Sequence, residues 1–178
     1  MMPIAPLMIE HRLIERMIRV IGTEITRIEQ TGRVDPEFVD MAVDFVRTYT
    51  DNCHHGKEED ILFRQLMDKP LSDELKAILS ELIEEHRKGR QVVSDLVKAK
   101  EEYLRGNEGA VSQVMGCLRF LVEFYPVHIE KEDRHFFLPC MNYFTPDEKD
   151  EMLSEEYEFD RNFIHYRYRT MVEKAEKG

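Results

Sequence analysis

The hydrophobic residues of this chain recur at three- and four-residue intervals, which places their side chains on one face of an α-helix. In the first segment this face comprises Leu7, Ile14, Ile18, Ile21, Ile25 and Ile28. Between Leu7 and Ile14 the inward position is held by His11 instead of a large hydrophobic residue. The pattern predicts an amphipathic helix over about residues 6–30, ending near Gly32.

Residues that start or end helices divide the remainder of the chain. Asp35-Pro36, Ser72 and Thr145-Pro146 are typical helix starts, and we expect Pro139 to end a helix. The predicted helical ranges are 35–67, 72–105, 108–139 and 145–176. Because short connections join long helices, neighbouring helices should be antiparallel. The sequence therefore predicts an all-α fold, an up-down-up-down four-helix bundle with an additional C-terminal helix.

We interpret residues 1–178 as one domain, with a core bundle over about 7–140 and a helical extension over about 145–176. The extension carries apolar and aromatic residues, among them Met152, Tyr157, Phe159 and Phe163. It has the composition of an amphipathic cover that packs on the bundle or on a second subunit. A homodimer formed through this helix is accordingly one expectation.

Composition excludes several classes of function. Of the 178 residues 42% are hydrophobic and 34% charged, and the net charge is −11. An acidic protein is a poor partner for nucleic acid, which is bound by clustered Lys and Arg. No run approaches the ~20 apolar residues of a membrane span, and the N-terminus does not read as a secretory signal, so we expect a cytoplasmic protein without membrane contact. The three cysteines lack C-x-x-C spacing, and Cys53 is interpreted as a reduced, partly buried thiol.

The polar residues that interrupt the apolar faces indicate a metal site. His54 with Glu58 and His128 with Glu132 form two H-x-x-x-E pairs, and a helix places residues i and i+4 on the same face. His86 lies on an apolar stripe, as His11 does. Buried imidazoles and carboxylates need partners, and carboxylates can bridge two cations. The predicted ligands of a dinuclear centre, for which iron is the best candidate, are His11, His54, Glu58, His86, His128 and Glu132.

The second helix allows two registers, because His54-His55 is followed by Glu58-Glu59. Counting back from His54 in steps of a helical turn reaches a more apolar set of residues than counting back from His55. We therefore choose His54 and Glu58, with His55 and Glu59 as partners of the ligands or as alternative ligands.

These segments together resemble the hemerythrin-like (HHE cation-binding) proteins. The resemblance rests on EHRLIERM around His11, HHGKEEDILF around His54, EEHRKGR around His86 and HIEKEDRHFFLP around His128. It spans roughly residues 7–140 and implies a four-helix bundle with a non-heme di-iron centre bridged by two carboxylates. Carried over residue by residue, it implies the same six ligands.

One departure from the family pattern concerns the third helix. Oxygen-carrying hemerythrins have two histidines one turn apart there, whereas Leu82 and Arg90 flank His86 in this chain. The resemblance therefore favours reaction with oxygen, nitric oxide or peroxide, in redox, sensing or iron–sulfur-repair roles, over reversible oxygen carriage. A metal-dependent sensor or interaction module, an iron store without catalysis, and a reversible oxygen carrier remain the alternatives. Whether the protein is an enzyme stays open.

Overall fold

The computed structural model describes the backbone of residues 2–177 and the side chains of residues 2–163 and of Arg167. Over this part of the chain the secondary structure is helical, without strands. The elements are α1 (Ile4–Thr31), α2 (Pro36–Phe45), η1 (Val46–His55), η2 (Glu58–Phe63), α3 (Arg64–Met67), α4 (Asp73–Leu104), α5 (Ala110–Glu130), η3 (Lys131–Phe136), α6 (Phe137–Cys140), η4 (Met141–Tyr143) and α7 (Pro146–Lys177).

The long helices begin and end within two residues of the positions that the sequence predicted. Gly32 follows α1 with a positive φ of 67°, a conformation that glycine adopts without strain. The Asp35 side chain accepts hydrogen bonds from the amides of Glu37 and Phe38, and the Ser72 side chain accepts one from the amide of Leu75. These contacts satisfy amides that lack a partner at a helix start.

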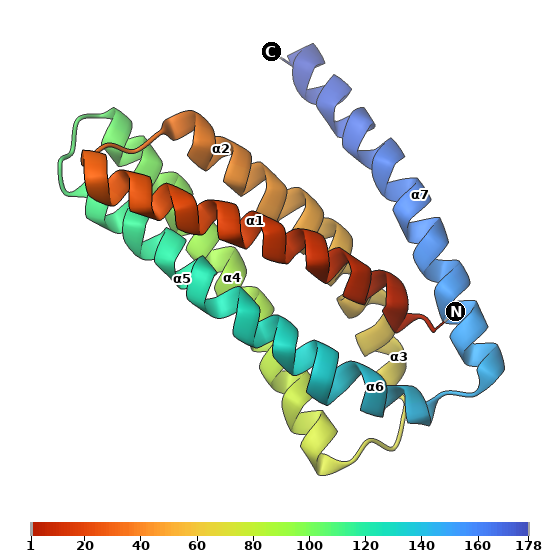
Figure 1. The fold of residues 1–178 in the computed structure, drawn as a ribbon. Coiled ribbons are helices and arrows are strands. Elements are labelled where there is room, and N and C mark those ends of the chain that lie inside the picture. Colours follow the sequence, from red (N-terminus) through yellow and green to blue (C-terminus); the bar gives the residue numbers. More distant parts are fainter. Residues whose placement is uncertain (1, 178) are drawn as a thin grey trace.

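Four helical stretches lie side by side and alternate in direction, so the predicted up-down-up-down bundle is confirmed (Figure 1). The first is α1, the second runs from α2 through η1 and η2 to α3, the third is α4, and the fourth runs from α5 through η3 to α6. The additional helix α7 follows and returns along the outside of the bundle (Figure 1).

The interior consists of two hydrophobic clusters with a polar layer between them. One cluster includes Ile14, Val93 and Tyr125, and the other includes Leu7 and Leu82. His11 lies on α1 between Leu7 and Ile14, and His86 lies on α4 between Leu82 and Val93. His11 and His86 therefore occupy a layer that has packed apolar side chains on both sides.

Three segments around this layer, η1, η2 and η3, are π-helical. A π-helix joins residues i and i+5, so each turn contains more residues than an α-helical turn and each residue turns the chain less. Adjacent side chains consequently point in more similar directions than in an α-helix. The α-helical spacing expected from the sequence does not hold in these segments, and this difference changes which side chains reach the interior.

The fourth helical stretch ends at Cys140, one residue after Pro139, where the sequence predicted its end. The chain remains helical through α6 to Cys140 and continues as the 3₁₀ turn η4. Phe136 has φ −117°, which interrupts the regular helix just before α6. Pro139 therefore lies in the first turn of a new helical segment, where its missing N–H is not needed for an intrahelical bond.

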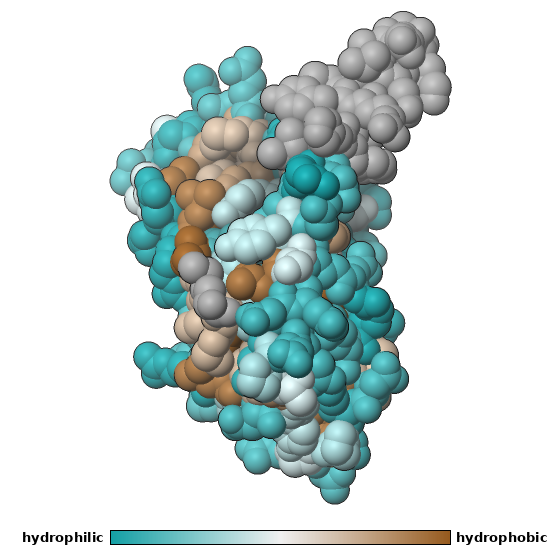
Figure 2. Space-filling model, turned by 90° about the vertical axis from the view of Figure 1, so that its right-hand side faces the viewer, coloured by the Kyte–Doolittle hydropathy of each residue, from teal (hydrophilic) through white to brown (hydrophobic). Residues whose placement is uncertain are grey.

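Helix α7 begins with a reciprocal cap: the Glu148 amide donates to Thr145 Oγ1, and the Thr145 amide donates to Glu148 Oε2. Its first half packs against η2, with Met152 and Glu156 buried. The face of the molecule seen in Figure 2 is largely hydrophilic, with a strip of apolar residues. Within the described residues no helix combines the length and the apolar character that a membrane crossing requires.

Candidate metal centre

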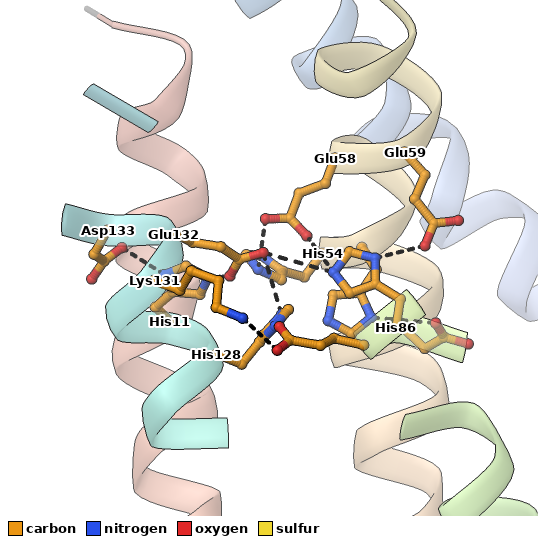
Figure 3. A network of polar contacts seen from close by, with 12 residues as sticks. His11, His54, Glu58, Glu59, His86, His128, Lys131, Glu132 and Asp133 are labelled. Atoms are coloured by element: carbon orange, nitrogen blue, oxygen red, sulfur yellow. Dashed lines mark hydrogen bonds and ion pairs between the residues drawn. The ribbon is translucent and has the colours of Figure 1, made fainter. Parts of the chain in front are cut away.

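The six predicted site residues come together in the polar layer. His11 comes from α1, His54 from η1, Glu58 from η2, His86 from α4, His128 from the last turn of α5 and Glu132 from η3. Each of these side chains is 1% exposed or less. Figure 3 shows the carboxylates of Glu58 and Glu132 among the rings of the histidines.

Each of the two carboxylates faces histidines from different helices. One oxygen of Glu58 lies 3.5 Å from His54 Nε2, and the other lies 3.5 Å from His86 Nε2. One oxygen of Glu132 lies 3.2 Å from His11 Nε2, and the other lies 3.2 Å from His128 Nε2. Both carboxylates are thus placed between two sets of imidazole nitrogens, which is the position that a bridging ligand requires.

A fifth histidine, His55, belongs to the same layer. The sequence analysis kept it as an alternative because α-helical spacing turns only one of His54 and His55 inward. In the π-helical η1 both are buried, and the His55 ring stacks on His86 with ring centroids 3.8 Å apart. Potential ligand atoms fall into two compact groups, His55–His86–His128 and His11–His54–Glu58–Glu132. Five buried histidines therefore lie in this layer, one more than the four that the sequence placed on inward faces.

Every one of these histidines has its Nδ1 next to a carboxylate. The Nδ1 atoms of His11, His54, His86 and His128 lie 2.7–2.9 Å from Asp133, Glu10, Glu59 and Glu85, respectively. His55 Nδ1 is 3.4 Å from Asp51. A carboxylate at Nδ1 favours the tautomer with the proton on that nitrogen, and the lone pair of Nε2 then faces the interior.

Sequence reasoning found Glu59 as a partner of the ligands but missed Glu10, Glu85 and Asp133. Each of these acids is the sequence neighbour of a predicted ligand: Glu10 precedes His11, Glu85 precedes His86 and Asp133 follows Glu132. Each one nevertheless accepts from a histidine on another helix. A carboxylate directly beside four of the six predicted ligands was therefore a signal in the sequence, but the partner of each carboxylate depends on how the helices pack.

Sequence reasoning also missed two lysines in corresponding positions. Residues 54–58 and 128–132 both read H-x-x-K-E. Lys57 pairs with Glu10, which accepts from His54, and Lys131 pairs with Glu85, which accepts from His128. Each lysine holds the carboxylate that orients its own histidine (Figure 3 shows Lys131 beside His128).

The interior atoms of this layer lack hydrogen-bond partners. Without one are Nε2 of His11, His54, His86 and His128 and both oxygens of Glu58 and Glu132. When an imidazole is neutral with its proton on Nδ1, its Nε2 presents a lone pair to a carboxylate oxygen, and two acceptors facing each other in a buried space are unfavourable. Cations between them remove this conflict. The donor set of imidazole nitrogens and bridging carboxylates fits iron or a similar divalent metal.

The pKa shifts of the histidines and of Glu58 in this layer also favour the binding of cations. Burial lowers the pKa of His54 to about 4 and that of His55 well below its usual value. Burial also disfavours charged His11, but the hydrogen bond to Asp133 and the negative charge of the nearby Glu132 outweigh this effect and raise the pKa of His11 to about 9. Burial and the neighbouring Glu132 raise the pKa of Glu58. In the metal-free protein, protons thus take positions that cations would otherwise occupy.

A small cavity adjoins the layer on the side of His55 and His86. Its volume is about 70 Å³, and its wall includes Asp51, Arg90 and Tyr125. Because one water molecule occupies about 30 Å³ in the liquid, the cavity can hold a molecule of a few atoms. The guanidinium of Arg90 binds both Asp51 and Glu59, so it ties the cavity wall to the carboxylate that accepts from His86.

Residues 2–138 match the family model described as the hemerythrin HHE cation binding domain. The match includes the five buried histidines and both central carboxylates, Glu58 and Glu132, and it ends before α7. No curated protein and no solved structure matches the chain.

Proposed function

The chain belongs to the hemerythrin HHE cation-binding domain family, and from that premise we propose that it binds two iron ions in the histidine layer and reacts there with dioxygen, nitric oxide or peroxide. Glu58 and Glu132 are the proposed bridging ligands. His11 and His54 are proposed to hold one ion, and His55, His86 and His128 the other. When bound, the metal pair would supply redox chemistry and positions for a small ligand.

The observation that carries this proposal is the set of interior lone pairs without partners, each fixed by a carboxylate on the far side of its ring. An arrangement of this kind is costly unless cations bind. The adjoining cavity supports a small ligand, because its volume of about 70 Å³ can hold a molecule of a few atoms. Arg90 and the Tyr125 hydroxyl provide polar groups on that side.

Metal analysis after anaerobic purification from the native host tests the metal part of the proposal. We expect two iron ions per chain and loss of at least one in the His128→Ala, Glu132→Ala double variant. A single zinc ion bound tetrahedrally would contradict the proposal. The exposed His135 provides a matched control, since His135→Ala should keep both ions.

Reversible oxygen carriage is the second candidate function, and the burial of His55 favours it. The sequence argument against carriage was the absence of a fifth histidine, and His55 supplies a fifth imidazole from another helix. Stopped-flow mixing of the reduced protein with oxygen distinguishes reversible carriage from redox chemistry. A coloured species that disappears under vacuum with return of the reduced protein indicates carriage, and irreversible oxidation or peroxide turnover indicates redox chemistry.

A further inference from the structure

Helix α7 lies outside the part of the chain that matches the family, yet two of its side chains contact the segment between His54 and Glu58. Asp160 accepts a hydrogen bond from Lys57 Nζ at 2.8 Å. Phe159 packs directly on Gly56, where a Cβ atom would lie only 2.8 Å from the tip of the Phe159 ring. The absence of a side chain at residue 56 is therefore what allows α7 to approach.

Lys57 connects α7 to the candidate metal centre. Its side chain is fully buried, and its ammonium group pairs with Glu10 as well as with Asp160. The other oxygen of Glu10 accepts from His54 Nδ1 at 2.9 Å. An unbroken series of polar contacts thus runs from Asp160 through Lys57 and Glu10 to His54.

Asp160 is important because the ammonium group of Lys57, which it contacts, is buried. With no water in contact, Lys57 depends on carboxylates for its hydrogen bonds. Without the charge of Asp160, the ammonium would have to move toward solvent, which it can reach where the Asp160 side chain is 42% exposed. Glu10 would then lose the partner that fixes it, and His54 would lose its fixed orientation.

We propose that Asp160 and Phe159 of α7 are positioning residues for His54, so that docking of α7 sets the orientation and metal affinity of this ligand through Lys57 and Glu10. The inference rests on the proposed function, since it concerns one of the proposed ligands. It makes α7 part of the metal site even though that helix supplies none of the proposed metal ligands.

The second H-x-x-K-E segment offers a matched control. Lys131 pairs with Glu85 in the way that Lys57 pairs with Glu10, and its further carboxylate is Glu81 of α4. Lys131 is 17% exposed and Glu81 is 58% exposed, so water can replace Glu81. Removing the Glu81 charge should leave His128 in place, whereas removing the Asp160 charge should disturb His54.

The experiment compares Asp160→Asn with Glu81→Gln in the full chain. In metal-free protein, two-dimensional ¹H–¹⁵N spectra of the histidine rings report the tautomer of each imidazole. Titration with Co²⁺ then reports affinity and the ligand environment through its absorption spectrum. We expect Asp160→Asn to mix the tautomers of His54 and to weaken binding of one cobalt ion by about tenfold, the lower range for groups that orient a ligand. Glu81→Gln should change the affinity less than about twofold on the same reasoning.

Two further variants sharpen the test. Asp160→Glu keeps the charge and should recover part of the affinity and of the tautomer, and Asp160→Ser removes the charge with a smaller side chain if the Asn variant unfolds. Unchanged His54 tautomer and cobalt binding in Asp160→Asn would overturn the inference, as would an equal effect of Glu81→Gln. If the wild-type protein takes up no cobalt, the proposed function fails, while the tautomer of His54 still decides the role of α7.

Discussion

Residues 54–58 and 128–132 place the same three side chains in the same relation, but their surroundings differ. In both segments the histidine donates to Oε2 of a glutamate and the lysine pairs with Oε1 of that glutamate. Around Lys57 the additional helix α7 closes the network, and the lysine is fully buried. Around Lys131 the network ends on α4 at the surface. The local motif therefore orients a histidine, and the packing around it decides how strongly that orientation is held.

The second residue of each motif gives a further contrast. His55 and Ile129 occupy corresponding positions, and both are buried at 3% exposure. Ile129 belongs to the hydrophobic core, whereas His55 lies within reach of His86 and His128. The same inward position thus adds to the core in one helix and adds a nitrogen to the candidate site in the other.

The strongest test of the symmetry between the segments is removal of the two central carboxylates. Glu58→Ala and Glu132→Ala should each reduce bound metal from two ions to one or none, because each carboxylate faces histidines of different helices. Metal analysis by mass spectrometry measures the loss. Retention of both ions in one variant would show that only the other carboxylate bridges.

The difference between His55 and Ile129 can be removed by giving residue 55 the isoleucine side chain found at residue 129. The His55→Ile variant should fold, and its affinity for one of two cobalt ions should fall about tenfold or more, as expected for loss of a ligand nitrogen. Cobalt titration monitored by absorption measures the change. If affinity is unchanged, His55 is a neighbour of the site and the four-histidine set of the sequence analysis holds.

Replacement of each lysine by methionine compares a buried ion pair with a partly exposed one. Lys57→Met leaves Glu10 and Asp160 without their cation and should lower the free energy of unfolding by about 2–4 kcal/mol. Lys131→Met should lower it by about 1 kcal/mol or less, because water can solvate Glu81 and Glu85. Urea denaturation of the metal-free proteins measures both. Equal losses would mean that burial by α7 does not distinguish the two networks.

Acid should destabilise the metal-free protein through His54. Its pKa is about 4 in the folded protein against an ordinary 6.5, so the unfolded chain binds the proton more readily. The contribution is present above pH 6.5 and is lost as the pH falls toward 4, amounting to about 2–3 kcal/mol. Denaturation curves across this range measure it, and the His54→Gln variant should show a smaller loss. The exposed His135→Gln variant should behave like wild type.

A rise in pH from 4.5 to 8 tests the surroundings of Lys57 through Glu156, whose buried carboxyl group on α7 has no hydrogen-bond partner. Burial raises its pKa to about 8, although the nearby Lys57 acts in the opposite direction. The neutral form is favoured in the folded state, so stability is lost as the pH rises from 4.5 through 8. Glu156→Gln should remove this loss and stabilise the protein by about 1–2 kcal/mol at pH 8. The exposed neighbour variant Glu155→Gln should leave the loss in place.

The sequence by itself determined the helical bundle, the start of each long helix and the inward position of six polar residues. The periodic placement of Leu7, Ile14 and Leu82 fixes which faces are buried, because a helix repeats its face every three or four residues. His11 and His86 stand within those stripes, so their burial follows from the same period. The caps at Asp35 and Ser72 are likewise local, since they involve amides two or three residues away.

Only the tertiary structure decided which buried groups contact one another, because the helical period of the sequence does not contain this information. His55 turns inward because η1 is π-helical, whereas α-helical spacing predicts that only one of His54 and His55 faces the interior. Glu10 accepts from His54 and not from its neighbour His11, because helices that cross bring residues distant in sequence together. Asp160 reaches Lys57 only because Phe159 packs on Gly56. Periodicity records which side of a helix is buried, whereas packing between helices determines what each buried group meets there.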